Sequence, residues 1–213
     1  MIGVTFGSMH SSDWGLVFQN WDITLPQLKT QIITPSTMNG NIDLTEFLGE
    51  RFYENRTLTL TFAYVGAQSS FHTLRTNVAN YLHGKVMDII FDDDTNYYYR
   101  GRCMVDSLKT VSNESYMKLV ITCNVDPYKY KATEYSNTFT VSSSKTVTVA
   151  NDEMIVSPDI TSSADMTLTF NQKTYAIKTG SQKMYGVRLQ PGNNTLTFTG
   201  SGNITISFRG GTF

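Results

Sequence analysis

The sequence predicts a mainly β protein of two domains, the first of which carries a single α-helix. Three observations lead to this expectation. Apolar and polar residues alternate in many short segments, one segment alone repeats its apolar residues at clear helical spacing, and no helix pattern follows Pro127. Alternation with a period of two is typical of half-buried antiparallel strands, because successive side chains point to opposite faces of a sheet.

Six segments show the alternation most clearly. In each of them an apolar residue occupies every second position, and mostly Thr, Ser, Lys or Asn stands between. The strands are expected at residues 56–62, 118–125, 145–150, 166–170, 194–200 and 203–208. Their apolar positions are predicted to face a core and their polar positions to face water.

The helix is expected within residues 69–85, "SSFHTLRTNVANYLHGK". Ser69 or Ser70 is expected to cap its start, and Gly84 to occupy the left-handed position after its end. An amphipathic helix of this kind is predicted to pack on a sheet. The residues of its apolar face are Phe71, Leu74, Val78, Tyr81 and Leu82.

A domain boundary is expected shortly after Pro127. Proline lacks a backbone donor and forces the preceding Asp126 into extended geometry. Beyond this point the sequence consists of short strands rich in Thr, Ser, Asn and Gly. We therefore expect an N-terminal β-barrel or sheet domain with one helix at residues 1–133, and an all-β sandwich at residues 134–213.

Two loops are predicted from turn chemistry. The tetrapeptide "MNGN" at residues 38–41 indicates a hairpin in which Asn39 and Gly40 take positive φ. The pentapeptide "DDDTN" at residues 92–96 indicates a second hairpin loop, because Asp and Asn favour turns. Its carboxylates are expected to lie in solvent or to meet a partner protein.

The acidic loop does not have the pattern of a calcium site or of a catalytic pair. Asp92, Asp94 and Asn96 match the start of a calcium-binding loop, but Tyr97 stands where a glycine is needed and Cys103 where a bidentate Glu is needed. Neighbouring side chains along a strand diverge, so adjacency of aspartates alone makes no catalytic pair.

The two cysteines are expected to lie opposite each other. If the surrounding hairpin turns near Asn113, Cys103 and Cys123 face one another on the side that also carries Val105 and Ile121. Two interpretations stay open: reduced core thiols, as is usual in the cytosol, or a disulfide. Neither interpretation is catalytic.

Several functional classes are disfavoured by the sequence. A formal net charge of -1 without a basic run disfavours nucleic-acid binding, and no apolar run reaches the ~18 residues that would predict membrane insertion. Neither His10 nor the helical pair His72 and His83 has metal-ligand spacing, and no phosphate-binding loop occurs. We expect no enzymatic activity, no cofactor and no metal.

Six signatures in one order carry a resemblance to a known family. They are "SSDWGLVF" (11–18), "NGNIDLTEF" (39–47), "FYENRTLTLTF" (52–62), "YLHGK" (81–85), "IIFDDDTNYYYRGR" (89–102) and "CNVDPYKYK" (123–131). Together they resemble the distal tail protein of long-tailed, siphovirus-type bacteriophages and prophages. The resemblance covers the first domain.

The resemblance implies a structural protein of the virion tail tip, synthesised in the cytoplasm of the host bacterium. It implies a homohexameric ring that joins the tail tube protein to the tail-tip (tail-associated) protein, with a receptor-binding protein as a further partner. The N-terminal domain would form the ring, and the C-terminal domain would be a galectin-like sandwich. The C-terminal module here is shorter than in many relatives, which leaves its galectin-like topology open.

Five residues of one predicted strand are candidates for subunit contacts, since Tyr and Arg are favoured in interface cores. The alternative is that alternate residues, such as Tyr98 and Arg100, form the solvent face of the strand. The candidates are Tyr97, Tyr98, Tyr99, Arg100 and Arg102.

A second hypothesis is a carbohydrate-binding role of the C-terminal module at the host surface. Sugar-binding platforms usually need exposed aromatic rings, and both Trp14 and Trp21 lie in the N-terminal domain. Tyr175 and Tyr185 are the candidates for glycan contact, and burial in the core is the alternative for both.

Overall fold

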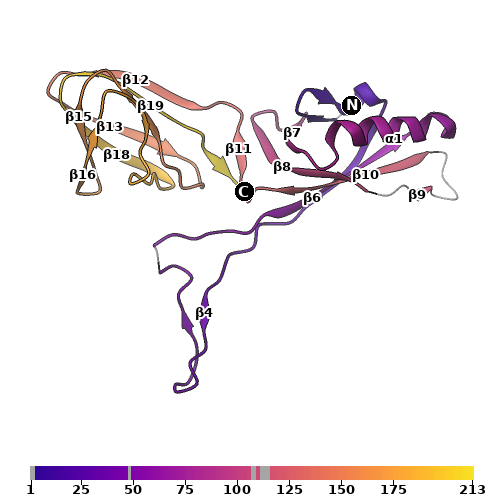
Figure 1. Ribbon diagram of the computed structural model, residues 1–213, viewed down its shortest axis with the longest axis horizontal. Helices are drawn as coiled ribbons and strands as arrows, with labels where there is room; N and C mark the ends of the chain where they lie inside the picture. Colours follow the sequence, from indigo (N-terminus) through magenta and orange to yellow (C-terminus); the bar gives the residue numbers. More distant parts are fainter. Residues whose placement is uncertain (1–2, 48, 107–108, 111–115) are drawn as a thin grey trace. The chain divides into compact units, whose positions relative to one another are not determined.

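The computed structural model describes residues 3–47, 49–106, 109–110 and 116–213. The chain divides into two compact units, Met1–Lys129 together with Phe213, and Tyr130–Thr212. Each unit has its own hydrophobic core. The fold is mainly β with one α-helix, as the sequence predicts (Figure 1).

One antiparallel sheet dominates the first unit, in the order β2-β1-β7-β8-β10-β6-β3. Phe18 and Trp21 on β3 contact Phe91 on β7, with ring centroids 6.1 and 5.4 Å apart. The sheet therefore curls, so that β3 meets β7 across the core. The strands are β1 (Val4–Phe6), β2 (Met9–His10), β3 (Val17–Ile23), β6 (Arg56–Tyr64), β7 (Val86–Phe91), β8 (Tyr97–Val105) and β10 (Met117–Val125), with β9 (Lys109–Thr110) beside β10.

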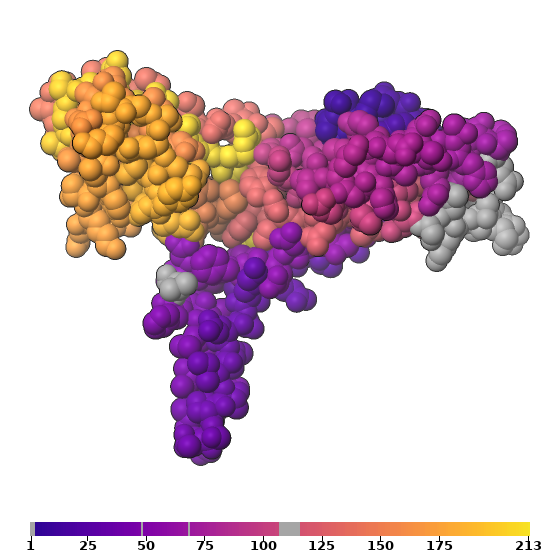
Figure 2. Space-filling model, in the orientation of Figure 1, coloured from indigo at the N-terminus to yellow at the C-terminus, as the bar shows by residue number. Residues whose placement is uncertain are grey.

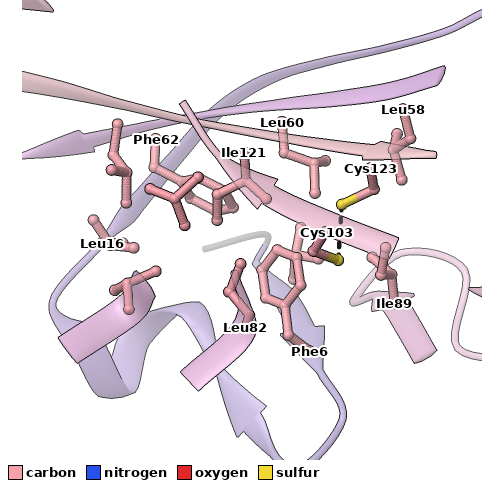
Figure 3. Packing of buried hydrophobic residues seen from close by; sticks show 14 of the residues in the cluster. Phe6, Leu16, Leu58, Leu60, Phe62, Leu82, Ile89, Cys103, Ile121 and Cys123 are labelled. Carbon is pink, nitrogen blue, oxygen red and sulfur yellow. Dashed lines mark hydrogen bonds between the residues drawn. The ribbon is translucent and has the colours of Figure 1, made fainter. Parts of the chain in front are cut away.

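The core of the first unit lies between this sheet and the helix α1 (Gln68–Leu82). Alternate residues of β6, namely Leu58, Leu60 and Phe62, are fully buried, as their period of two predicts. Figure 3 shows how these side chains gather with Leu82 of the helix and Ile121 of β10. The helix therefore covers the apolar face of the sheet.

The helix begins earlier than expected. Its N-cap is Ala67, which has no side-chain capping bond, and the predicted serine cap at Ser69 or Ser70 is wrong. The Ser70 N–H already donates to the Ala67 carbonyl at 3.0 Å, so both serines lie inside the first turn. The expected end is confirmed, since Gly84 follows the C-cap with a φ of 77°.

The predicted apolar face of the helix is correct. Phe71, Val78 and Leu82 are buried, and Leu74 and Tyr81 pack against the core from its edge. A short 3-10 helix, η1 (Ser11–Trp14), precedes β3, and Trp14 contacts Tyr81 with centroids 5.5 Å apart.

The second unit is a sandwich of two four-stranded antiparallel sheets. One has the order β12-β19-β14-β17 and the other β13-β18-β15-β16. Their inner faces share one core, in which the ring centroids of Phe139 on β12 and Phe198 on β18 lie 5.4 Å apart. The strands are β12 (Tyr135–Val141), β13 (Ser144–Asn151), β14 (Asp159–Ser162), β15 (Met166–Phe170), β16 (Lys173–Ile177), β17 (Gly180–Lys183), β18 (Gly192–Thr199) and β19 (Gly202–Phe208), and a short pair joins β11 (Lys129–Lys131) to β20 (Gly211–Thr212).

Candidate functional site

The most unusual feature of the first unit is a long hairpin, residues 24–55, which we call the arm. It leaves the sheet after β3 and returns at β6, and these two strands are neighbours in the sheet. Near its base Leu28 pairs with Tyr53, and farther out β4 (Ile32–Ile33) pairs with β5 (Ile42–Asp43). In Figure 1 the arm is the violet hairpin that carries the label β4.

Main-chain hydrogen bonds hold the two sides of the arm together. The Lys29 N–H donates to the Phe52 carbonyl, and the Leu44 N–H donates to the Gln31 carbonyl, each at 2.8 Å. At the tip Gly40 takes the expected positive φ of 84°, but Asn39 does not, so this half of the prediction is wrong. Because Ile33 pairs with Ile42, the loop spans residues 34–41 and needs no two-residue turn.

The arm carries eight of the fourteen large hydrophobic side chains that are exposed in the described part of the chain. Phe47 is 79% and Leu25 75% exposed, and neither described core cluster includes an arm residue. In Figure 2 the arm is the narrow violet projection. Among the described residues of the arm, the exposed large apolar ones are Leu25, Leu28, Ile32, Ile33, Met38, Ile42, Phe47 and Phe52.

Little within the arm compensates for this exposure. A two-stranded hairpin is marginally stable in water on its own. The ion pairs Lys29–Glu54 (3.9 Å) and Arg51–Glu46 (3.4 Å) are solvent-exposed, and such pairs contribute at most about 1 kcal/mol. Phe47 and Phe52 line an open concavity of ≈ 550 Å³ on the side of the arm. An apolar surface rimmed by charges in this way is typical of a protein-binding site.

The five candidate interface residues lie on β8, and the structure separates them. Tyr99 points into the core, is 8% exposed and lies beneath the Arg56 guanidinium, 5.3 Å from its ring centre. Arg100 and Arg102 lie on the outer face, where Arg100 pairs with Asp88 at 2.9 Å and Arg102 donates to the Gly84 carbonyl.

The two tyrosines at the start of β8 are half-buried. Lys129 Nζ lies 4.6 Å from the ring centre of Tyr97 and pairs with Asp94 at 2.7 Å. Tyr98 is also half-buried. Only one side of β8 is therefore accessible to a partner, and it carries Arg100 and Arg102.

The acidic loop joins β7 to β8 as predicted, but its carboxylates do not simply lie in solvent. Asp92 Oδ2 accepts the Gly3 N–H at 2.7 Å, and Asp94 pairs with Lys129. Both side chains are 38% exposed, so they lie in solvent as expected, but each also has a partner within the chain. Only the tertiary fold brings Gly3 and Lys129 to this loop.

His10 lies in a local arrangement that resembles the order of groups in a serine hydrolase. Its Nδ1 lies 2.6 Å from Ser12 Oγ, and its Nε2 lies 3.3 Å from Asp92 Oδ2. The Ser12 N–H also donates to Nδ1, and the His10 N–H donates to Asp13 Oδ2 at 2.9 Å. These contacts form a capping box at the start of η1, which gives the arrangement a structural role.

The glycan candidates differ from each other in the second unit. Tyr175 packs against the core, and its hydroxyl donates to the Gly186 carbonyl at 2.7 Å. Tyr185 lies in the turn after β17 and is 76% exposed. Of the two rings, Tyr185 alone is presented freely to solvent.

The described residues contain neither a group of metal-ligating side chains nor a membrane-spanning helix. Within them, no group of three or more His, Cys, Asp or Glu side chains could hold a metal ion. His83 Nδ1 accepts the Val105 N–H at 3.0 Å, so this side chain ties the C-cap of α1 to the end of β8. None of the described helices is both long and apolar enough to cross a bilayer.

Reasoning from the sequence predicted a hairpin at residues 38–41 but missed the length and the exposed apolar surface of the arm. Its apolar residues follow neither a period of two nor a helical period over any length, so they give no strand or helix signal. A usable signal was present, however: residues 24–55 combine many Leu, Ile and Phe residues with no pattern that would bury them.

Comparisons with known proteins support the fold. No protein-family model matches the sequence, and no curated protein matches it. Among solved structures, the chain is similar to the Dit protein (gp 19.1) of phage SPP1, with a TM-score of 0.71 and 15% identity. The match covers 98% of this chain and 99% of that one, and the SPP1 protein is described as a paradigm of the hub adsorption apparatus in phages that infect Gram-positive bacteria. The chain therefore has the fold of a phage distal tail protein over nearly its whole length.

Proposed function

We propose that this protein is a structural hub of a phage tail tip and acts by assembly, without catalysis. Copies of the first unit would form a homohexameric ring that joins the tail tube protein to the tail-tip (tail-associated) protein. The fold of the phage SPP1 hub protein supports this role. The sixfold number and the two neighbours follow from the resemblance of the sequence motifs to distal tail proteins.

The observation that carries the ring proposal is the arm. Its eight exposed apolar side chains belong to a hairpin with no core of its own. Each such side chain contributes about 1.5–3 kcal/mol when it is fully buried, so docking on another surface is strongly favoured. A second copy of the same chain is the partner that every subunit has available.

An arm that docks on a neighbour makes a heterologous contact, because the donor and acceptor surfaces differ. Contacts of this kind form a closed ring when the rotation between subunits closes, and an open filament otherwise. Arg100 and Arg102, on the outer face of β8, are proposed to contribute polar contacts to the same assembly. Tyr99 is left out of this set because its ring is buried in the core.

The second unit is proposed to hold a further tail component, such as a receptor-binding protein. Its sandwich has a complete core. The virion tail tip would be the final location, after synthesis in the host cytoplasm.

The assembly can be tested by measuring the mass of the full-length protein over a concentration series with light scattering after size exclusion. We expect a species of six chain masses with an annular image in electron microscopy. The variant Leu25→Ser/Phe47→Ser should lose it, whereas Val65→Ser, which changes a 69% exposed residue outside the arm, should keep it.

Two results would contradict the proposal. A hexamer that persists in the arm variant would remove the arm from the ring contact. A monomer at every concentration that also fails to bind tail tube and tail-tip proteins would remove the hub role.

A carbohydrate-binding role of the second unit is the second candidate, and the 76% exposed Tyr185 is the observation that favours it. Aromatic rings free on one face can stack on sugars. Retention of the protein on host cell-wall glycans should then fall in Tyr185→Ala. Equal retention of Tyr185→Ala and the unchanged protein would exclude this site.

A further inference from the structure

We propose that Cys103 and Cys123 form an oxidation site, at which two buried thiols close to a cross-strand disulfide that clasps β8 to β10. The structure holds both cysteines as free thiols. The inference concerns the chemistry of the first unit and does not depend on the proposed function.

The register of the sheet places the two residues directly opposite each other. Cys103 pairs with Cys123 between β8 and β10, as the sequence predicts, although Asn113, where the hairpin was expected to turn, lies outside the described residues. The Cys103 N–H donates to the Lys85 carbonyl at 2.9 Å, and its carbonyl accepts the Gly84 N–H at 2.7 Å. Its main-chain bonds therefore point away from β10.

The two cysteines thus form a non-hydrogen-bonded pair, the position at which opposite side chains come closest in an antiparallel sheet. Their sulfur atoms lie 2.9 Å apart. Figure 3 shows the two side chains directed at each other, with the contact drawn between the sulfurs. A disulfide needs an S–S distance of about 2.05 Å. Rotation of the two side chains can bring the sulfur atoms this close without moving either strand.

The surroundings hold the pair together and also protect it. Both cysteines are fully buried, and Cys123 lies beside Leu58 of β6. The hydrogen bond to Cys103 Sγ, followed by burial, raises the pKa of Cys123. The thiolate is the reactive form, so oxidation of the folded protein is expected to be slow and to proceed when the β8–β10 hairpin opens.

Hydrogen peroxide is a sufficient oxidant for closing the disulfide. One thiolate attacks a peroxide oxygen and breaks the O–O bond, which yields a sulfenic acid and a hydroxide that takes up a proton to become water. The second thiolate attacks the sulfenic sulfur, the S–S bond forms and the S–O bond breaks, and the hydroxide that leaves takes up a proton to become a second water. The protein loses two protons and two electrons, and the peroxide is reduced to two molecules of water.

The bond would tie the middle of β8 to the middle of β10 and close the loop between residues 103 and 123. A disulfide that closes a loop of this length lowers the equilibrium constant for unfolding by roughly 250-fold in the chain-entropy account of disulfides. Such a disulfide persists in oxidising surroundings outside a cell and is reduced in the cytosol.

The test uses the full-length protein, first reduced and freed of reductant. It is then treated with hydrogen peroxide, either in native buffer or at a denaturant concentration just below the unfolding transition. After unfolding and alkylation, intact mass and peptide maps are recorded. We expect a product that loses two hydrogens, escapes alkylation at both cysteines and yields a linked peptide, and that forms faster near the transition.

Cys123→Ala is the matched control, because it keeps Cys103 and all nine methionines, which peroxide also oxidises. Peroxide should raise the guanidinium concentration at the midpoint of unfolding for the unchanged protein, but not for Cys123→Ala. Unfolding the oxidised protein, reducing it and refolding it should return the midpoint to its original value. Sulfinic acids or two alkylated thiols in place of the linked peptide, even after refolding in peroxide, would overturn the proposal. An equal change of midpoint in both proteins would do so too.

Discussion

Ile23 and Leu58 pair across β3 and β6, and the whole arm lies between these two paired residues in the sequence. The arm is therefore an insertion at a hairpin position, and the sheet does not need it in order to close. An element that exposes apolar surface and could be removed without breaking the core is best explained by a contact outside the subunit.

Replacing residues 27–54 by a short Gly- and Asn-containing turn should leave the first unit folded but monomeric. The reason is that neither described core cluster includes an arm residue. Thermal unfolding should give a melting temperature close to that of the unchanged protein, while light scattering should show one chain mass. Loss of the folded state in this variant would mean that the arm stabilises its own subunit.

Gly101→Ala should destabilise the first unit by about 3 kcal/mol, near the upper end of overpacking costs. A Cβ atom at this position would press against the Asn124 carbonyl oxygen and lie 2.5 Å from Val125 Cα, and neither main-chain atom can move freely inside the sheet. Chemical denaturation measures the change. Met104→Ala, at an exposed site of the same strand, should stay within about 0.5 kcal/mol and serves as the control.

Asp92→Ala should lower the free energy of unfolding of the first unit by about 1–2 kcal/mol, because it removes the acceptor of the Gly3 N–H and the carboxylate that faces His10. Asp93→Ala changes the adjacent exposed carboxylate, which has no such contact, and should be nearly neutral. Denaturation midpoints of the two variants provide the comparison. Equal midpoints would show that the acidic loop is not anchored through Asp92.

Asp165 predicts a specific dependence of stability on pH in the second unit. A hydrogen bond from Lys178, followed by those from the Thr179 N–H and hydroxyl, lowers the pKa of Asp165 to about 2. A carboxyl whose pKa is lower in the folded state stabilises the fold above the unfolded pKa, about 3.8, and this contribution disappears as the pH falls through about 2.

Asp165→Asn should therefore be less stable than the unchanged protein at neutral pH, and the difference should vanish near pH 2. Denaturation midpoints of both proteins from neutral pH to about pH 2 measure this. A difference that is constant over the whole range would mean that the charge of Asp165 contributes nothing.

The sequence alone determined the local elements, because they depend on neighbouring residues. Alternating apolar residues identified β6 and β10, and three- and four-residue spacing identified the buried face of α1. The same alternation placed Cys103 opposite Cys123, since a register set by one buried face leaves little freedom. The motifs of the first domain also indicated the fold that the comparison with SPP1 Dit supports.

Only the tertiary structure decided which apolar residues lack a core and which polar residues have partners. Phe47 and Phe62 are chemically identical, but the sheet buries Phe62 and leaves Phe47 79% exposed. Asp92 meets Gly3 and His10 because β1 and β7 are paired, a contact between distant parts of the chain. Burial and long-range pairing depend on how elements pack together, and the local pattern of residues carries no record of that packing.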